Sequence, residues 1–326
     1  MYRIIVNPIA GRGRTPERLR LLTGEFDRMG IAYDVYTTQC VMDGQTKARE
    51  ICETTPDCPG IIGLGGDGTL QEIADGMFAA FNAKDSPTQR IPVPLGVFPA
   101  GSGNDFVMSL LNGKPNALKR YKKNRIPDAA RVFAQSIKEN RTRTVDLITA
   151  NGAAYMNIGN LGLDARIVKN AFALKERWGR YAYVAAVYKS IARHSNVPLT
   201  IEVNGEKIDD TFTLVAICNG QYYGGGLHIS PMAKIDDGKI TLCLVRGMSR
   251  PKTMLIFPSL MIEKHTHLKA VSFMECEEVR ITLGEHALPG ETLCLDGNLY
   301  PLTCAGQNPG QTFLFKIHPQ VLDVFV

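Results

Sequence analysis

The sequence predicts an α/β protein of two domains, an N-terminal doubly wound α/β domain followed by a mainly antiparallel β domain. The chain has 326 residues, more than one ordinary domain needs. Up to about residue 127, apolar strand-like runs alternate with segments of helical periodicity, a pattern typical of a parallel sheet with helices on its faces. Beyond that point short strands dominate, separated by turn signals such as Asn204-Gly205 and Asp296-Gly297.

The first domain, residues 1–127, is expected to hold four strands joined by helices. Thr15-Pro16 predicts a helix start, with Thr15 as the N-cap and Pro16 in the first turn. Its strands are expected at 3–6, 33–38, 60–64 and 93–98, and its helices from 15, over 45–52 and over 70–81.

The second domain, residues 128–310, is expected to begin with a helical connector over 128–138. Residues 311–326 are a candidate to pack back on the first domain. The later strands are expected at 143–149, 153–158, 199–203, 211–218, 239–245, 278–283, 292–295 and 312–317, with helices near 178–192 and 252–264.

Composition excludes several classes of protein. Hydrophobic residues make up 44% and charged residues 21%, which is globular rather than disordered. The net charge of +5 suits contact with phosphates or an anionic membrane surface, but no basic run with interleaved aromatic residues points to nucleic acid. The 8 cysteines show no zinc spacing, and no apolar stretch reaches about 18 residues. We therefore expect a cytoplasmic protein whose contact with the inner face of a membrane, where it occurs, is peripheral.

A glycine-rich segment, Gly65-Gly66-Asp67-Gly68-Thr69, lies between the third predicted strand and a helix. Glycines let the backbone approach a polyphosphate closely, and the unpaired N–H groups of a helix start attract anions. A carboxylate there would repel phosphate unless it binds Mg²⁺ or accepts a proton from an attacking hydroxyl. The segment is neither a Walker A loop nor GxGxxG, and the alternative is a glycine-rich turn with a capping aspartate.

Three further loops follow the other strands of the same predicted sheet. They are Asn7 to Gly13, Thr37-Thr38, and Pro99 to Asp105. Because the carboxyl ends of parallel strands meet at one edge of a sheet, all four loops are expected to share one crevice.

Three motifs, in this order, resemble the diacylglycerol-kinase catalytic domain family, which includes bacterial lipid kinases and sphingosine and ceramide kinases. They are Val6-Asn7-Pro8-x-Ala10-Gly11, Gly65 to Thr69, and Pro99-Ala100-Gly101-Ser102-Gly103-Asn104-Asp105-Phe106. Ser102 stands where the family usually has threonine and keeps the hydroxyl. The resemblance covers nearly the whole chain. It implies Mg²⁺-assisted transfer of the γ-phosphoryl group of ATP to a hydroxyl of a diacylglycerol-like or other lipid.

The resemblance also implies roles for individual residues. Asp67, Asp296 and Asn298 are the candidate catalytic residues, with Asp105 and Asp296 organising a metal or its waters. On the acceptor side it places Asp105, Asp164, Arg177 and Arg180. Residues expected to bind ATP are Asn7, Thr38, Gly65, Gly66, Asp67, Gly68, Thr69, Glu72 and Ser102.

A structural Mg²⁺ is implied near residue 237. The stretch Asp236-Asp237-Gly238-Lys239 resembles the one that holds this ion in bacterial members of the family. By position, Asp237 would give its carboxylate, and Lys234 and Lys239 their backbone carbonyls, and ligation by oxygen alone suits Mg²⁺. The alternative for Asp237-Gly238 is a plain hairpin turn, and both interpretations can hold together.

One residue departs from the family. Where relatives carry Asp-Gly-Glu, with glutamate as the presumed general base, this chain has Asp296-Gly297-Asn298. An amide cannot accept a proton as a base. Either Asp67 or Asp296 takes that role, another glutamate moves in, or the chain is a poor kinase.

Two alternatives to a lipid kinase remain open. The Gly-Gly-Asp-Gly element is shared with NAD kinases, so an NAD-kinase-like enzyme is one. The other is a catalytically impaired relative that binds nucleotide or lipid, which Asn298 alone supports. Expected partners are ATP, a lipid alcohol and a peripheral membrane surface, and the sequence leaves the oligomeric state open.

Overall fold

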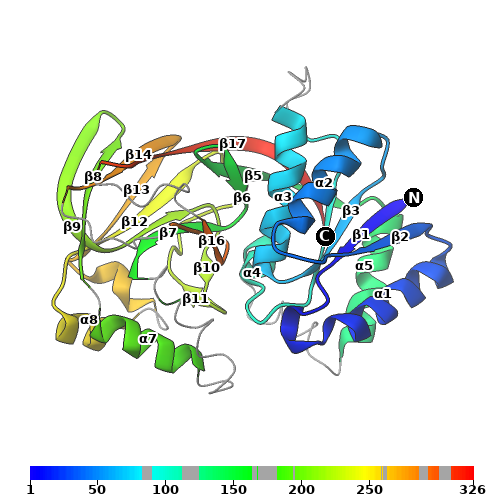
Figure 1. Ribbon diagram of the computed structural model, residues 1–326, viewed down its shortest axis with the longest axis horizontal. Coiled ribbons are helices and arrows are strands. Elements are labelled where there is room, and N and C mark those ends of the chain that lie inside the picture. The colour runs from blue at the N-terminus through cyan, green and yellow to red at the C-terminus, as the bar shows by residue number, and fades with distance from the viewer. Residues whose placement is uncertain are drawn as a thin grey trace.

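The structure, a computed structural model, describes residues 1–82, 90–111, 125–163, 167, 182–193, 195–257, 259, 263–285, 293–300 and 310–326. It consists of an α/β half and a β-rich half joined through one extended sheet (Figure 1). In the described residues no helix is long and apolar enough to cross a membrane. The predicted fold class, a doubly wound α/β domain with a mainly antiparallel β domain, is confirmed.

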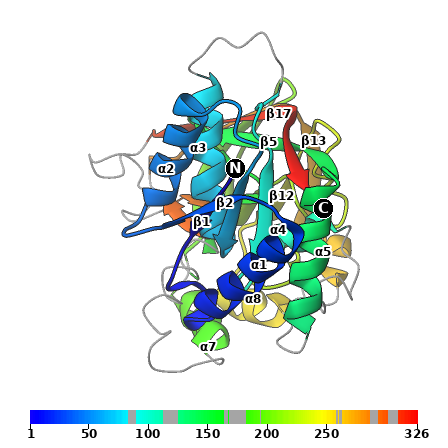
Figure 2. The same ribbon diagram turned by 90° about the vertical axis from the view of Figure 1, so that its right-hand side faces the viewer.

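The α/β half is built on a parallel sheet in the order β2-β1-β3-β4. Its central strands are buried on both sides, since Ile4 and Val6 pack with α1 and α5 whereas Ile5 packs with α2 and α3. Figure 2 shows α1 and α5 together on one side of this sheet, and α2 and α3 on the other. The elements are β1 (Tyr2–Val6), α1 (Thr15–Met29), β2 (Tyr33–Thr37), α2 (Asp43–Thr54), β3 (Ile61–Gly65), α3 (Asp67–Asn82), β4 (Leu95–Pro99), α4 (Asp105–Leu110) and α5 (Ile126–Lys138).

The β-rich half is antiparallel, and its main path runs β16-β15-β7-β9-β8-β14. A second branch extends from β9 through β12 to β13. Its strands are β5 (Thr142–Ala150), β6 (Ala153–Tyr155), β7 (Ile158–Gly162), β8 (Val197–Val203), β9 (Glu206–Cys218), β10 (Tyr222–Tyr223), β11 (Leu227–His228), β12 (Ile240–Arg246), β13 (Val271–Cys276), β14 (Glu278–Leu283), β15 (Leu293–Leu295) and β16 (Asn298–Tyr300). The helices α7 (Ala182–Ala192) and α8 (Arg250–Ile256) pack side by side below it, and a 3-10 turn follows at Lys264–His267.

The last strand, β17 (Thr312–Phe325), connects the two halves. It pairs antiparallel with β14 and β5 in the β-rich half, and its end pairs parallel with β4 through Val324 and Leu95. The strand predicted at 312–317 therefore continues past Pro319, because an irregularity between His318 and Leu322 lets the chain bypass the missing N–H of the proline.

Several predicted boundaries were wrong for identifiable reasons. The strand expected over 153–158 is split into β6 and β7, because the backbone N–H groups of 156–158 bond a buried carboxylate rather than a neighbouring strand. Thr15 is the first residue of α1 rather than its cap, and its hydroxyl donates to the Ala10 carbonyl at 3.0 Å. The helix expected over 252–264 ends at Ile256, and α4 and the short hairpin β10–β11 have no clear pattern in the sequence.

Candidate active site

The loops that end β1, β2 and β3 meet at the carboxyl edge of the parallel sheet. The Asn7 side-chain amide donates to the Thr69 hydroxyl at 3.0 Å, which links the first loop to the start of α3. The backbone N–H of Thr38 donates to the Val6 carbonyl at 2.9 Å, so Thr38 flanks the same edge. The structure thus brings together Asn7, Thr38 and Thr69.

The glycine-rich loops after β3 and β4 touch through their backbones. The Ala100 N–H donates to the Gly65 carbonyl at 2.7 Å. A Cβ on Gly101 would lie 2.5 Å from the Gly66 Cα, closer than any side chain tolerates, so the contact requires glycine. Ser102, at the tip of the second loop, is exposed. The two predicted loops therefore form one surface.

Asp67 begins α3 and binds the neighbouring loop. Its carboxylate accepts the backbone N–H of Asn104 at 2.8 Å and of Phe106 at 3.3 Å. Burial raises the pKa of Asp67, and the N–H donors from Phe106 and Asn104 oppose this. The side chain is half-buried, so it keeps access to the crevice.

Asp105 connects the two halves of the molecule. It lies at the start of α4, and its carboxylate accepts the N–H groups of Gly225 at 2.9 Å and Gly226 at 2.7 Å, in the β10–β11 hairpin. Burial, followed by the negative charge of Asp67, raises the pKa of Asp105 to about 7. Only 6% of Asp105 is exposed.

Asp296, in the β15–β16 turn, binds backbone N–H groups within the β-rich half. Its carboxylate accepts the N–H groups of Met156 at 2.8 Å and Ile158 at 2.7 Å, and that of Asn157 as well. Burial raises the pKa of Asp296 to about 7, and the negative charge of Asp67 adds to this rise.

These carboxylates form an acidic cluster, which we define as Asp67, Asp105 and Asp296. One oxygen of Asp105 and one of Asp67 lie 2.7 and 3.0 Å from the point that a Cβ on Gly103 would occupy. In the described residues no three acidic, histidine or cysteine side chains converge closely enough to hold one metal ion by themselves. Mg²⁺ in phosphoryl-transfer sites is commonly held by one or two carboxylates together with substrate phosphates and waters, so the cluster is compatible with it.

Asn298 reaches from β16 to the first turn of α3. Its amide nitrogen donates to the Gly68 carbonyl at 2.9 Å and to the Gln71 side-chain oxygen at 2.8 Å. A Cβ on Gly68 would lie 2.5 Å from the Asn298 amide oxygen, so glycine is needed at 68 to admit this side chain. The sequence reasoning missed Gln71, although a polar residue among Leu70, Ile73 and Ala74 on a buried helix is a usable signal.

Glu72, in the second turn of α3, contacts the start of α2. It is 9% exposed, and burial raises its pKa against the backbone N–H donors of Met42 and Gly44 at the start of α2. Its role in nucleotide binding stays a prediction, whereas its contacts with the start of α2 are those of a helix cap.

The predicted structural metal site lies in the loop before β12. Asp237 accepts the Lys239 backbone N–H at 3.1 Å, and the Lys239 ammonium pairs with Glu275 at 2.7 Å. The fully buried Asp146 accepts the adjacent Gly238 N–H at 2.7 Å. Lys234 is exposed in the same loop. The acceptor-side candidates Asp164, Arg177 and Arg180 lie outside the described residues.

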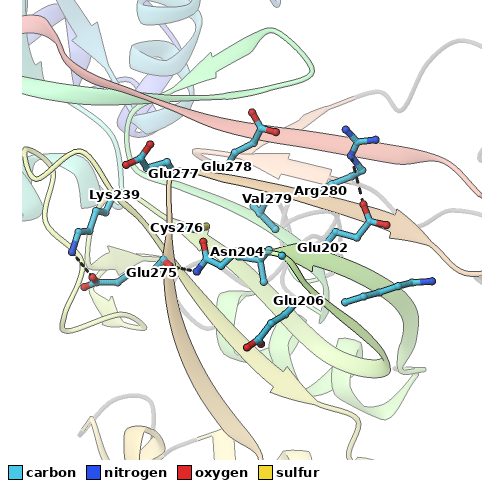
Figure 3. A pocket seen from close by; sticks show the side chains of 13 residues that line it. Glu202, Asn204, Glu206, Lys239, Glu275, Cys276, Glu277, Glu278, Val279 and Arg280 are labelled. Carbon is cyan, nitrogen blue, oxygen red and sulfur yellow. Dashed lines mark hydrogen bonds and ion pairs between the residues drawn. The ribbon is translucent and has the colours of Figure 1, made fainter.

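A large open cavity, of about 880 Å³, lies on the far rim of the β-rich half (Figure 3). Its wall includes the β8–β9 turn and the neighbouring ends of β13 and β14, and its charged side chains pair with one another, as Lys239 does with Glu275. None of the predicted catalytic or ATP-binding residues lines it, so its size does not make it the active site.

Comparison with known proteins identifies the family. Residues 1–150 match the model of the diacylglycerol kinase catalytic domain, and residues 158–326 match that of the YegS C-terminal NAD kinase beta sandwich-like domain. The diacylglycerol kinase of Bacillus subtilis (strain 168) is 22% identical over 284 residues, covering 87% of this chain and 86% of that protein. The diacylglycerol kinase of Mycobacterium tuberculosis (strain H37Rv) is 29% identical over 212 residues, 63% of each protein.

Solved structures agree at the level of the fold. A crystal structure from Bacillus anthracis (strain Sterne) superposes with a TM-score of 0.71 at 20% identity, covering 99% of this chain and 96% of that one. A second crystal structure from that strain, of a diacylglycerol kinase, gives 0.65 at 18% identity over the same shares. With both family models matching in sequence, and with the order of halves that they imply, the chain belongs to the family of diacylglycerol kinases and related lipid kinases.

Proposed function

We propose that this protein is an ATP-dependent lipid kinase that transfers the γ-phosphoryl group to a hydroxyl of a diacylglycerol-like lipid. The observation that carries the proposal is the acidic cluster. One carboxylate oxygen of Asp67 and one of Asp105 lie 3.0 and 2.7 Å from the Cβ position of Gly103, and Asp296, from the β-rich half, is near enough for the charge of Asp67 to add to the rise in pKa that its burial causes. Such a cluster is costly without a cation, and a kinase brings Mg²⁺ with its nucleotide.

The glycine-rich surface is the proposed nucleotide site. Gly66 and Ser102 lie beside the first turn of α3, whose N–H groups favour phosphate, whereas the Cβ positions of Gly65 and Gly68 are taken up by the Thr69 and Asn298 side chains. Asn7, Thr38 and Thr69 border the same edge and offer neutral polar groups to the nucleotide.

Asp67 is the proposed proton acceptor. In the reaction, the lipid oxygen forms a bond to the γ-phosphorus, the bond to the β–γ bridging oxygen breaks, and ADP leaves. The hydroxyl proton passes to the Asp67 carboxylate, which is the least enclosed member of the cluster. Asp105 links the two halves, since both of its carboxylate oxygens accept backbone N–H groups of the β10–β11 hairpin. Asp296 accepts its N–H groups within the β-rich half, where it fixes the segment between β6 and β7.

Mg²⁺, when bound with ATP, would neutralise charge on the β- and γ-phosphates, and Asp105 and Asp296 would organise the ion or its waters while Asp67 stays available as the base. A second, structural Mg²⁺ is proposed at Asp237 with the carbonyls of Lys234 and Lys239. Burial, and then the charges of Asp237 and Asp236, raise the pKa of Asp146 beside that loop, and a cation would offset these charges. The Arg143 guanidinium already pairs with Asp236 at 2.7 Å, which leaves Asp237 as the carboxylate for the ion.

An apolar pocket offers a place for the lipid. Tyr223 and Ile229 on the β10–β11 side, together with Met248, Ile256 and Phe257 near α8, line it. Tyr223 belongs to the hairpin whose glycines bind Asp105, so the pocket and the acidic cluster share one structural element. Its apolar lining is what a hydrocarbon chain would contact, but at about 40 Å³ the pocket must widen to admit one, so the lipid acceptor and a peripheral encounter with a membrane are proposals that rest on the lining alone.

One experiment tests the function. Purified protein is incubated with γ-labelled ATP, Mg²⁺ and a panel of lipid alcohols in mixed micelles, and Asp67→Asn serves as the comparison. We expect transfer to at least one lipid, reduced about 10²–10⁴-fold in Asp67→Asn at saturating ATP. If Asp67→Asn keeps near-parental turnover, Asp67 is not the base.

The same assay decides between the remaining functions. An impaired nucleotide- or lipid-binding relative, which Asn298 favours, would bind ATP in equilibrium dialysis and phosphorylate no lipid. NAD added to the panel tests the NAD-kinase-like alternative, against which the match of residues 1–150 to the diacylglycerol kinase catalytic domain counts.

A further inference from the structure

The Asn298 amide uses both of its N–H groups on α3. One donates to the Gly68 carbonyl at 2.9 Å and the other to the Gln71 oxygen at 2.8 Å. The amide oxygen has no partner in the described part of the chain, and it lies beside Gly68, one residue after Asp67. Asn298 therefore presents a single open hydrogen-bond acceptor next to the proposed base.

The orientation of this amide follows from two backbone carbonyls. The Gln71 amide nitrogen donates to the Ala154 carbonyl at 2.9 Å, which turns the Gln71 oxygen towards Asn298. Reversing either amide would place its oxygen against a backbone carbonyl oxygen. The carbonyls of Ala154 and Gly68 therefore fix which atom of each amide is the donor in the hydrogen bonds between Ala154, Gln71 and Asn298. A carboxylate at 298 would face the same two oxygens and be repelled.

Gln71 is held rigidly enough to act in this way. It is 3% exposed, and Asp75, four residues later on the same face of α3, accepts the Ala154 N–H at 2.7 Å. Both backbone groups of Ala154 are therefore bound by α3, which fixes the distance between Gln71 and β6.

We propose that Gln71 is a positioning residue that holds the Asn298 oxygen ready to accept a hydrogen bond from the acceptor hydroxyl. This inference rests on the proposed kinase function. Asn298 orients the hydroxyl oxygen towards the γ-phosphorus but takes no proton, which passes to Asp67. The asparagine that departs from the family pattern is, in this arrangement, a working partner of Gln71 rather than the remnant of a lost base.

A double-mutant cycle tests the proposal, with the variants Gln71→Ala, Asn298→Ala and their combination. Each single variant is expected to lower kcat roughly 10-fold with little change in the KM for ATP, because neither side chain is among the residues proposed to bind the nucleotide. The double variant is expected to be no slower than Asn298→Ala, since Gln71 acts only through Asn298. Multiplicative losses in kcat would overturn the proposal.

Asp75→Ala is the matched control. It removes the carboxylate that accepts the Ala154 N–H, but it leaves the hydrogen bond between Asn298 and Gln71 in place. Its loss in kcat should multiply with that of Asn298→Ala, as expected for independent sites. If Asp75→Ala shows the same coupling as Gln71→Ala, both residues act by holding β6 and Gln71 has no special role.

Urea unfolding of the same variants separates this inference from the proposed function. Non-additive shifts in midpoint for Gln71→Ala and Asn298→Ala are expected whether or not a lipid is phosphorylated. Additive shifts would show that the hydrogen-bond chain is not formed and would overturn the inference alone. A parent protein that is inactive on every lipid would overturn the proposed function and, with it, the catalytic role given to the chain.

Discussion

At the scale of single residues, the contacts of Asn298 decide what a glutamate would do there. Asn298→Glu restores the family's presumed base, but it removes the amide N–H groups that the Gly68 carbonyl and the Gln71 oxygen accept. It also adds negative charge near Asp67 and the triphosphate. We expect kcat at saturating ATP to stay flat or fall. A rise approaching roughly 10²-fold would show instead that a base is missing from this site.

The raised pKa values of Asp105 and Asp296, each about 7, predict a pH dependence of stability. Between the ordinary aspartate value of 3.8 and about 7, the folded protein holds protons that the unfolded chain has released. The unfolding free energy of the metal-free protein should therefore fall as pH rises through this window, by on the order of 1 kcal/mol or more for each group.

Urea unfolding at a series of pH values, in EDTA, measures this slope. Asp105→Asn removes one titrating group and should flatten the dependence between about pH 5 and pH 8. An unchanged slope in that variant would mean that Asp105 is ionised in the folded protein throughout the window.

The sequence predicted which residues belong to the site, but not which contacts require each of them. Gly68 was expected to make room for phosphates, whereas its Cβ position is blocked by the Asn298 amide, a residue far away in the chain. Asp105 was expected to face the acceptor, and its carboxylate binds two glycine N–H groups of a hairpin with no clear sequence pattern. Partners so distant in sequence leave no local pattern from which to predict them.

At the scale of elements, the contact between the two glycine-rich loops predicts the effect of filling it. Gly66→Asp adds a side chain whose Cβ would lie 3.3 Å from the Gly101 Cα, and it adds negative charge at the proposed phosphate site. ATP binding should weaken at least tenfold, or about 1.4 kcal/mol, by titration calorimetry.

Gly24→Asp is the control for this variant. Gly24 lies in α1 with open space around it. An aspartate there adds the same negative charge to the protein without entering the contact between the two glycine-rich loops. Equal ATP affinity in Gly66→Asp and the parent would show that this loop does not bind the nucleotide.

The loop before β12 predicts sensitivity to metal removal. If Mg²⁺ binds Asp237 in the folded state only, excess EDTA should lower the Tm by about 2–4 °C for each kcal/mol of linked stability. Asp237→Ala should start lower and lose this response, whereas Asp128→Ala, on the exposed face of α5, should keep it. Identical EDTA shifts in Asp237→Ala and the parent would rule out a metal at this residue.

Element positions were predictable where periodicity was strong and failed where tertiary contacts intervene. The four parallel strands are short runs rich in apolar and β-branched residues, and each was found within two residues of its predicted bounds. The run over 153–158 resembles one strand, but Asp296 takes the N–H groups that a continuous strand would need.

At the scale of the whole molecule, the order of the two halves was predictable, because the α/β alternation stops within the first half of the chain. Residues 311–326 were a candidate to pack back on the first domain, but one strand shared by both halves was not predicted. A strand that belongs to two sheet regions has no distinguishing composition, and the expected strand ended at 317.

The path of β17 restricts how the two halves can move. Two domains linked by a loop can swing apart about a hinge, at little cost in hydrogen bonds. Here β17 is hydrogen-bonded to β14 and β5 and, at its far end, to β4. One continuous strand therefore belongs to both halves. A hinge motion that moves the two halves apart would break the backbone hydrogen bonds of β17, whereas a twist of the halves about this strand would keep them. Substrate entry and product release should therefore proceed by torsion of small amplitude.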